Sequence, residues 1–401
     1  MELFNPTATQ EKTNKAPAGR PAALAFVNDA DSETVLQEAF LEEAPGAVLR
    51  GNITKAIHHL SGARSPRMLV VDISDVALPV SEVHRLADVC EPGVAVIAIG
   101  ARNEVGLYRD LLQAGVAEYL VKPLTPDLVA KAMNTALHGT DAAPISRKLG
   151  KLIAFVGARG GVGTSTIAVN LSWYFANRHG RRVALLDFDL HSGVCNLMLN
   201  LPPSNGLRDA LENPLRVDSL FLERTMTLHG ERLFVLGSQE PLEQELRFPA
   251  RAVDKLIEVL REQFHYVVVD LPRLPSAVSR RILEIADTRA IVVDQTLQSV
   301  RDAVRLGRLN RLDGGEHRDV FIVNRKGEAG RRAVSVDEMA GALEQRLGCV
   351  VPFQPALFAA AGAEGIVPVE QKGRFADAIG ALATEVSGQR TPPPSRWRLF
   401  R

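Results

Sequence analysis

The sequence predicts an α/β protein made of two doubly wound domains. Three observations lead to this prediction. Short apolar runs alternate with helical patterns along most of the 401 residues. A polar, proline-containing segment at 139–150 interrupts this alternation once. A glycine-rich loop at 157–163 follows an apolar run and opens into a helical pattern.

Composition places the chain among globular proteins of a reducing compartment. Hydrophobic residues make up 46% and charged residues 23%, and the formal net charge of +0 argues against broad electrostatic binding of nucleic acid. Cys90, Cys195 and Cys349 lie too far apart for a metal, iron–sulfur or disulfide motif. No apolar run reaches the roughly 18 residues of a membrane span. We therefore expect a cytoplasmic protein whose membrane contact is indirect or peripheral.

The first domain is predicted over 21–138, after a lead-in at 1–20 that has no periodic apolar pattern. Its strands and helices alternate in a five-unit βα pattern, which predicts a parallel sheet covered by helices on both faces. The expected strands are 22–27, 68–71, 94–99 and 118–121, and the expected helices are 32–43, 80–89, 105–114 and 126–137.

Polar residues follow the strands of this first domain at their carboxyl ends, where such sheets bind ligands. Asp29 follows the first strand, Asp72 closes the third, and Lys122 closes the last. In this order and spacing the segment resembles a response-regulator receiver domain of flavodoxin-like fold. The resemblance implies that Asp72 accepts phosphate, that Asp29 helps to hold magnesium, and that Lys122 contacts the phosphate.

Two positions depart from the receiver pattern. Asn28 stands at the first position of the acidic pair, and Gly100 stands where a Thr or Ser hydroxyl would be captured by the phosphate. Because glycine has no hydroxyl, we favour an atypical receiver that serves for docking. A switch phosphorylated at Asp72 is the alternative.

The second domain is predicted over 151–388, after the linker at 139–150. The expected strands are 152–157, 182–188, 233–237, 266–270, 290–294 and 320–324, and the expected helices are 165–178, 249–263, 299–312, 335–347 and 374–386. This alternation predicts a second doubly wound domain. The tail at 389–401 contains Trp397 between arginines. We expect it to be disordered, with docking to a partner or to a membrane surface as the alternative.

The loop after the first strand of this domain is predicted to bind phosphate. Closely spaced glycines let backbone N–H groups converge on an anion, and the next helix points its positive N-terminus at the same place. Ser165 stands where a hydroxyl holds magnesium. The lysine that ordinarily precedes this hydroxyl is missing, because the position holds Thr164. The expected cofactor contacts are Gly160, Gly161, Val162, Gly163, Thr164, Ser165 and Thr166.

Three polar residues end other strands of the second domain where a nucleotide site needs them. Asp189 can orient the water that attacks a γ-phosphate. Asp270 can bind magnesium directly or through water. Asn324 can offer its amide to an adenine edge. Each residue alone is equally well explained as a strand cap, but together with the loop they predict a site for ATP and Mg²⁺.

With these residues the domain resembles the MinD/ParA group of deviant phosphate-loop ATPases over 151–388. The resemblance implies that Arg159 replaces the lysine that reaches the phosphates of a partner subunit in a sandwich dimer. Thr164 then replaces the lysine that cradles the phosphates. The resemblance also implies that Arg325 and Pro352 lie at the nucleotide base.

The combination of an atypical receiver with a loop that lacks its lysine is similar to the CpaE/TadZ family of Tad-type pilus assembly proteins. The resemblance implies a cytoplasmic organiser of the pilus secretion machine, at the cell pole on the inner face of the inner membrane. It implies a nucleotide-sensitive homodimer whose partners are a secretion ATPase or an inner-membrane platform protein. Nucleic acid is not expected as a partner.

The missing lysine predicts weak catalysis. An ammonium group stabilises the transition state more than the ground state, so its loss reduces hydrolysis more than binding. Arg159 keeps a cation at the position that faces the partner subunit. We therefore expect ATP binding with slow or absent hydrolysis. The alternatives are a scaffold that binds no nucleotide and a phosphorelay output protein switched at Asp72, and a DNA-partitioning ATPase is disfavoured.

Overall fold

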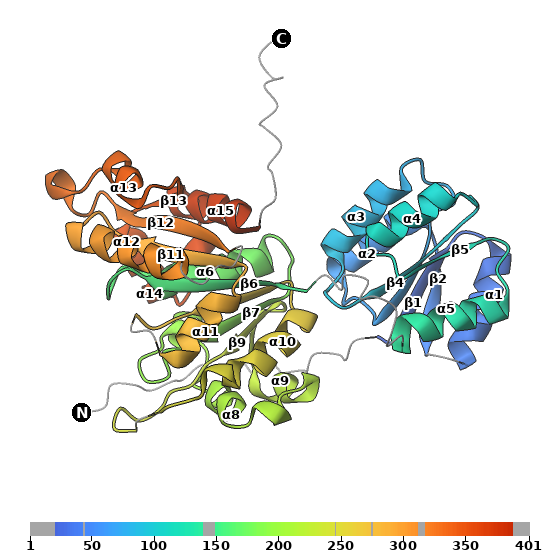
Figure 1. The fold of residues 1–401 in the computed structure, drawn as a ribbon, viewed down its shortest axis with the longest axis horizontal. Coiled ribbons are helices and arrows are strands. Elements are labelled where there is room, and N and C mark those ends of the chain that lie inside the picture. The colour runs from blue at the N-terminus through green and yellow to red at the C-terminus, as the bar shows by residue number, and fades with distance from the viewer. Residues whose placement is uncertain are drawn as a thin grey trace, which may run out of the picture. The chain divides into compact units, whose positions relative to one another are not determined.

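The computed structural model describes residues 21–42, 45–138, 149–244, 246–273, 276–311 and 317–387. The chain divides into two compact units, residues 1–83 with 94–142 and residues 84–93 with 143–401 (Figure 1). The predicted lead-in at 1–20, the predicted tail at 389–401 and most of the predicted linker at 139–150 lie outside the described residues.

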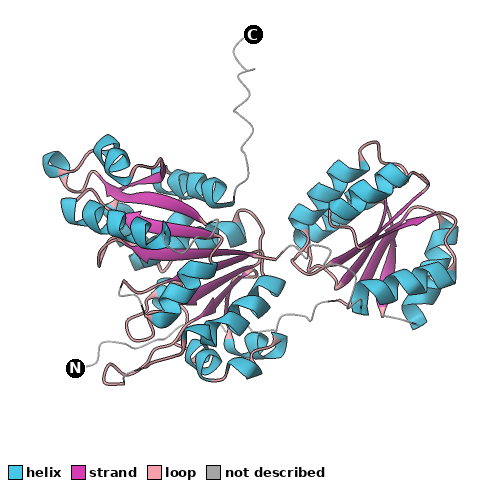
Figure 2. Ribbon diagram, in the orientation of Figure 1, coloured by secondary structure: helices cyan, strands magenta, loops and turns pink. Residues whose placement is uncertain are grey.

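The first unit contains a parallel sheet with the strand order β2-β1-β3-β4-β5. Its strands are β1 (Ala23–Val27), β2 (Gly46–Arg50), β3 (Met68–Asp72), β4 (Ala95–Gly100) and β5 (Glu118–Val121). The helices of this part of the chain are α1 (Ala30–Glu42), α2 (Ile53–Gly62), α3 (Pro79–Val89), α4 (Val105–Gln113) and α5 (Pro126–His138). The strand order is that of the flavodoxin-like fold, and helices cover both faces of the sheet (Figure 2).

Sequence patterns predicted these elements except β2 and α2. The edge strand β2 is mostly exposed, so it lacks the apolar run that marks a buried strand. The helix α2 begins after Asn52, whose side chain accepts hydrogen bonds from the backbone N–H groups of Thr54 and Lys55. It buries Ile53, Ala56 and Leu60. This spacing is helical, but the stretch is short.

The core of the first unit forms around β1 and β3, which are buried along their whole lengths. Ala25 and Val70 pack in one apolar cluster with Leu36 of α1 and Met133 of α5. Burial of both central strands places their carboxyl ends in the middle of the sheet edge. Asp72 ends β3 at this edge.

The second unit contains a sheet with the strand order β13-β12-β11-β6-β10-β7-β9-β8, in which only β8 runs antiparallel to its neighbour among the described strands. The strands are β6 (Lys151–Gly157), β7 (Val183–Asp187), β8 (Thr227–His229), β9 (Leu233–Leu236), β10 (Tyr266–Asp270), β11 (Thr288–Val293), β12 (Arg318–Lys326) and β13 (Leu347–Pro352). The helices are α6 (Thr164–Asn177), α7 (Cys195–Met198), α8 (Gly206–Glu212), α9 (Ser219–Thr225), α10 (Asp254–Gln263), α11 (Ala277–Ile285), α12 (Leu297–Arg311), α13 (Val336–Leu343), α14 (Pro355–Glu364) and α15 (Arg374–Ser387).

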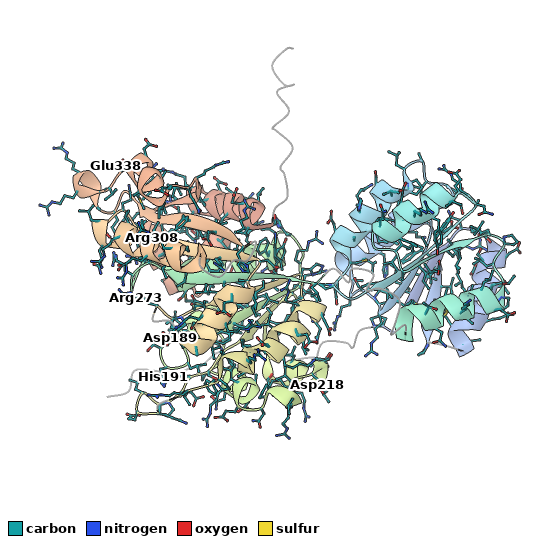
Figure 3. All side chains as sticks on the ribbon, in the orientation of Figure 1. Asp189, His191, Asp218, Arg273, Arg308 and Glu338 are labelled. Carbon is teal, nitrogen blue, oxygen red and sulfur yellow. The ribbon has the colours of Figure 1, made fainter. Side chains whose placement is uncertain are left out.

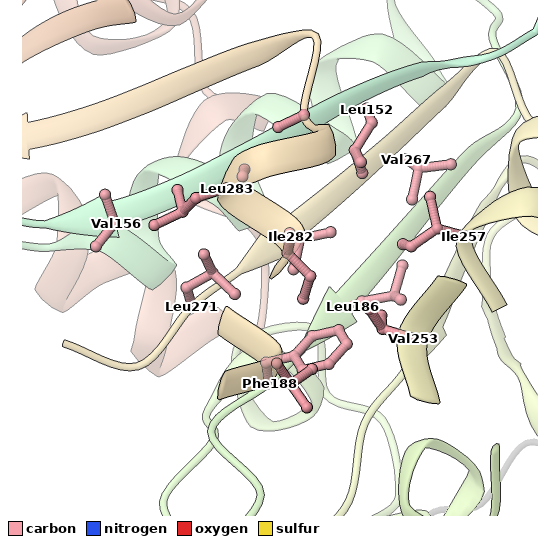
Figure 4. Packing of buried hydrophobic residues seen from close by; sticks show 14 of the residues in the cluster. Leu152, Val156, Leu186, Phe188, Val253, Ile257, Val267, Leu271, Ile282 and Leu283 are labelled. Carbon is pink, nitrogen blue, oxygen red and sulfur yellow. The ribbon is translucent and has the colours of Figure 1, made fainter. Parts of the chain in front are cut away.

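Side chains of β6 alternate between two large apolar clusters, one on each face of this sheet. Leu152 packs with Ile257 of α10 and Ile282 of α11 in the cluster that Figure 4 shows. Phe155 packs with α6 and with Phe375 of α15 in the cluster on the other face. Because β6 and β10 are buried on both faces, their carboxyl ends are rigidly held. The glycine-rich loop begins at the end of β6, and Asp270 is the last residue of β10.

Several details of the second unit differ from the prediction. The helices α11 and α14 and the strand β13 were not predicted. The helix expected over 335–347 begins with the predicted capping box of Ser335 and Glu338. It ends at Leu343, because Glu344 adopts the left-handed conformation with φ 52°. The segment between β7 and β9, for which no element was predicted, contains α7, α8, α9 and β8, which are all short.

None of the helices in the described part of the chain combines the length and the apolar character that crossing a membrane requires.

Candidate nucleotide-binding site

The glycine-rich loop joins β6 to α6 through a tight turn. Gly161 and Gly163 have φ values of 75° and 92°, which residues with a Cβ adopt at a cost. Gly157 is packed against the start of the helix, since a Cβ there would lie 2.5 Å from Thr164 Oγ1. The first turn of α6 therefore opens directly onto the loop, as an anion site requires.

Thr164 and Ser165 occupy the first turn of α6 with different surroundings. The Thr164 hydroxyl lies over Gly157. The Ser165 hydroxyl lies close to the carboxylate of Asp270, where it partly offsets the rise in the pKa of this acid that burial and the charge of Asp187 cause. Thr166 lies next in the same turn, where its carbonyl accepts a hydrogen bond from the Asn170 amide at 2.8 Å. Ser165 is therefore the hydroxyl that joins the loop to a strand-end acid.

Asp270 is the most strongly perturbed acid of the site. Burial first, and the charge of Asp187 second, raise the pKa of Asp270 to about 7. Its Oδ1 atom has no hydrogen-bond partner among the described residues. A buried, unpartnered carboxylate oxygen near the Ser165 hydroxyl is a donor set that fits Mg²⁺, which prefers oxygen ligands. Asp270 and Ser165 can therefore hold the ion that the sequence predicts.

Asp189 lies on the turn that follows β7, near His191 (Figure 3). Its backbone N–H donates to Asp187 Oδ1 at 3.2 Å, and its own Oδ1 accepts from the Ser192 backbone N–H at 3.0 Å. These contacts hold the turn in a defined conformation. The carboxylate of Asp189 is partly exposed, as a residue that orients water must be.

Asn324 supports the loop from β12. Its Nδ2 donates to the Val162 carbonyl at 2.8 Å, and its Oδ1 accepts from the Arg325 backbone N–H at 2.8 Å. A Cβ at Gly163 would lie 2.4 Å from this Nδ2 atom. Both ends of the amide are thus engaged within the chain. In this structure Asn324 braces the loop, and a role at the adenine edge stays a prediction.

Arg325 and Pro352 come together at the ends of β12 and β13. Arg325 has a left-handed backbone with φ 54°, and its guanidinium lies 3.5 Å from Glu328 Oε1. Pro352 pairs with Lys326 across the two strands, and the next residue, Phe353, donates its backbone N–H to the Lys326 carbonyl. The two residues predicted at the base are therefore neighbours in space.

Arg159 lies in the loop and is bonded within its own chain. Its guanidinium donates to both carboxylate oxygens of Asp294, with 3.3 Å from Nε to Oδ1, and also to the Gly160 carbonyl at 3.1 Å. Burial opposes the charge of Asp294, but hydrogen bonds from Arg159 and Thr296 hold its pKa below the ordinary value. Sequence reasoning assigned no role to Asp294, although it follows a buried strand as Asp270 and Asp189 do.

The predicted receiver residues also meet in the first unit. Lys122 Nζ lies 2.5 Å from Asp29 Oδ2 and 2.6 Å from Asp72 Oδ2. Burial opposes the charge of Asp29, but hydrogen bonds from Lys122 and Ser32 lower its pKa to about 2. Asp72 has no exposed surface, and its Oδ1 accepts from both the hydroxyl and the backbone N–H of Ser74. The acid that could accept phosphate is therefore covered and fully hydrogen-bonded.

The space at Gly100 is filled by an aromatic side chain. A Cβ at this position would lie 2.5 Å from the hydroxyl of Tyr119, which is buried and donates to the Arg102 carbonyl at 2.8 Å. A Thr or Ser at position 100 would require this ring to move. The absence of a hydroxyl here is thus part of the packing of the unit.

Comparison with known proteins agrees with this geometry. Residues 150–331 match the family described as cellulose biosynthesis protein BcsQ. The septum site-determining protein MinD of Thermotoga maritima is 23% identical over 256 residues, 61% of this chain and 90% of that protein. The structure of MinD from Pyrococcus horikoshii, complexed with Mg-ADP, is 23% identical and has a TM-score of 0.52, covering 59% of this chain and 96% of that chain. The second unit is a P-loop unit of BcsQ/MinD/ParA-like fold.

A solved structure of a putative CpaE2 pilus assembly protein from Sinorhizobium meliloti 1021 is 31% identical. The match covers 29% of this chain and 99% of that chain, with a TM-score of 0.28.

Proposed function

We propose, on the premise that the second unit is a BcsQ/MinD/ParA-like P-loop unit, that it binds ATP and Mg²⁺ and hydrolyses ATP slowly or not at all. The observation that carries this proposal is the buried, unpartnered oxygen of Asp270 beside Ser165, at the N-terminus of α6. A cation at this place meets two oxygen donors of the chain, and an anion meets the backbone N–H groups of the loop.

Different residues are proposed to bind different parts of the nucleotide and its magnesium ion. The loop 157–163 and the first turn of α6 direct backbone N–H groups at the phosphates, and Ser165 with Asp270 would hold the magnesium ion. When bound, this ion neutralises phosphate charge. Asp189 is the candidate for orienting a water molecule, and Asn324 keeps the loop in its conformation through Val162. Arg325 and Pro352 are proposed at the base.

We expect slow hydrolysis because one cation of the loop is missing and the other is held in an ion pair. Thr164 offers a short hydroxyl where an ammonium group would stabilise the transition state. Arg159 is the cation nearest to Thr164 in the sequence, but it is paired with Asp294 in its own chain. It can act on the phosphates of a second copy only after leaving this carboxylate. We therefore propose a homodimer that forms in response to nucleotide rather than a rapid ATPase.

The first unit is proposed to serve as a docking module that is not switched by phosphate. Three contacts support this: Lys122 bridges Asp29 and Asp72, Ser74 occupies the other oxygen of Asp72, and Tyr119 fills the space at Gly100. A phosphoryl donor would have to displace these groups. Switching at Asp72 is therefore the less favoured alternative.

In the cell, we propose that the protein organises a Tad-type pilus secretion machine on the cytoplasmic side of the inner membrane, at the cell pole. The proposed partners are a secretion ATPase or an inner-membrane platform protein. The basis is the sequence resemblance, which combines an atypical receiver with a loop that has Thr164 in place of lysine. Loss of polar fluorescence of the tagged protein in cells without the secretion ATPase or platform would support this assignment.

The nucleotide proposal is tested by equilibrium dialysis of the full chain with labelled ATP and Mg²⁺. We expect saturable binding that Ser165→Ala weakens at least about tenfold, because one magnesium ligand is lost. Ser172→Ala is the matched control, since this buried hydroxyl of the same helix donates to the Ala168 carbonyl. Absence of saturable binding in the wild type at high protein concentration would instead indicate a scaffold that needs no nucleotide.

A further inference from the structure

We infer that Asp187, Cys195 and Asp270 form a buried site for a thiophilic divalent cation of the zinc class. The three side chains come from the end of β7, the first residue of α7 and the end of β10. All three residues are buried, and their ligand atoms lie within 4.8 Å of one another. They therefore provide one sulfur and two carboxylate groups around a common point.

Backbone contacts hold these donors in place. Asp187 and Asp270 are direct partners across the parallel strands β7 and β10. The Cys195 backbone N–H donates to Asp187 Oδ2 at 3.0 Å. Gly193 allows the preceding turn to close over Asp187, because a Cβ at this position would lie 2.5 Å from the same oxygen. The donor set is thus pre-organised by two strands and a tight turn.

The separation between sulfur and oxygen suits tetrahedral coordination. Cys195 Sγ lies 3.7 Å from Asp270 Oδ2. Zinc binds sulfur at about 2.3 Å and carboxylate oxygen at about 2.0 Å, which places neighbouring ligands of a tetrahedron roughly 3.5 Å apart. A zinc ion therefore requires only a small adjustment of these side chains. The fourth position is left for water.

The charge of the cluster also calls for a cation. Asp187 and Asp270 are 3% and 5% exposed, respectively. Within the described residues, no lysine or arginine forms an ion pair with either carboxylate, and Asp270 Oδ1 has no hydrogen-bond partner. Buried carboxylates without a counter-charge cost free energy. A divalent cation would compensate both of them at once.

The sulfur ligand of Cys195 determines which class of cation this site prefers. Magnesium and calcium prefer sites made of oxygen ligands, whereas thiolate ligands favour zinc and related ions. Binding replaces the thiol proton of Cys195, together with any proton held by Asp187 or Asp270, by the metal, and these protons are released to solvent. The site thus differs in chemistry from the proposed magnesium site, although both use Asp270.

The test uses the full chain, freed of metal with a chelator and titrated with Co²⁺ without magnesium or nucleotide. We expect a thiolate-to-cobalt charge-transfer band in the near ultraviolet that added Zn²⁺ abolishes. Cys195→Ser should lose this band and weaken Zn²⁺ binding in equilibrium dialysis at least about tenfold. Cys349→Ser, which removes another buried thiol, should change neither measurement.

A wild-type protein without the band, or a folded Cys195→Ser variant that keeps it, would overturn the inference. Cys195 would then be only a hydrogen-bond donor to Asp270. If Cys195→Ser does not fold, the Asp187→Asn variant is measured instead. The inference requires that this variant binds Zn²⁺ more weakly than the wild type, and an unchanged affinity for Zn²⁺ contradicts it. Because no nucleotide is present, these outcomes are separate from those of the ATP-binding test.

Discussion

The guanidinium of Arg159 donates hydrogen bonds to both carboxylate oxygens of Asp294, a buried residue that follows β11. The two residues lie 135 positions apart in the chain. The pairing keeps the loop cation within its own subunit. Contact of Arg159 with the phosphates of a second subunit would therefore compete with its ion pair to Asp294.

Asp294→Asn should release Arg159 and favour the dimer. The neutral amide holds a guanidinium less strongly than a carboxylate does. We expect dimerisation with ATP and Mg²⁺ at about tenfold lower protein concentration, equivalent to about 1.4 kcal/mol, measured by sedimentation velocity. Asp302→Asn is the matched control, since this acid pairs with Arg301 and Arg305 on α12. An unchanged dimerisation constant in Asp294→Asn would contradict competition between the two roles.

Thr164→Lys should raise the rate of ATP hydrolysis by at least about tenfold, because an ammonium group near the transferred phosphate stabilises the transition state. Phosphate release at saturating ATP measures this change. Thr164→Met provides a control of similar length without the charge and should stay at the wild-type rate. Equal rates in all three proteins would show that the missing lysine does not limit hydrolysis.

Asp270 should make the stability of the metal-free protein depend on pH. Burial and the charge of Asp187 raise its pKa to about 7, so the folded state holds a proton that the unfolded state releases near pH 4. Stability therefore falls as the pH rises from about 4 to about 7, by an amount on the order of a few kcal/mol. Urea unfolding across this range should show a smaller decrease for Asp270→Asn. Parallel profiles for the two proteins would refute a raised pKa.

Asp72 should resist phosphorylation by acetyl phosphate. Its side chain has no exposed surface, and Lys122, Ser74 and the Asn28 backbone N–H occupy its oxygens. Intact-mass measurement after incubation with magnesium and acetyl phosphate should show the unmodified mass. A mass increase of one phosphoryl group that Asp72→Asn abolishes would restore the phosphorelay alternative.

Gly100→Ala should destabilise the first unit by about 1–3 kcal/mol, because the new methyl group overlaps the Tyr119 hydroxyl. The loss should be smaller when Gly100→Ala is made in a Tyr119→Ala background, where the ring is absent. A double-mutant cycle by urea unfolding gives this coupling. Gly106→Ala is a suitable control, since a Cβ there meets no atom within 4 Å. Additive effects would mean that the ring does not restrict position 100.

Local patterns in the sequence were sufficient for the fold class and for the glycine-rich loop. Buried parallel strands are continuous apolar runs, and the residues after them fall on the same sheet edge. For this reason Asp29, Asp72 and Lys122 were predicted together and are found in contact. The edge strand β2 was missed because its exposure removes the apolar signal.

Tertiary structure alone decided how the site residues are engaged. Arg159 with Asp294, Asn324 with Val162, and Tyr119 over Gly100 are contacts between segments distant in sequence. No periodicity or motif records such contacts. The wide spacing of the cysteines likewise argued against a metal motif, but folding places Cys195 beside Asp270, which is 75 residues away. The sequence determined which groups reach the sheet edge, whereas packing determined which of them pair.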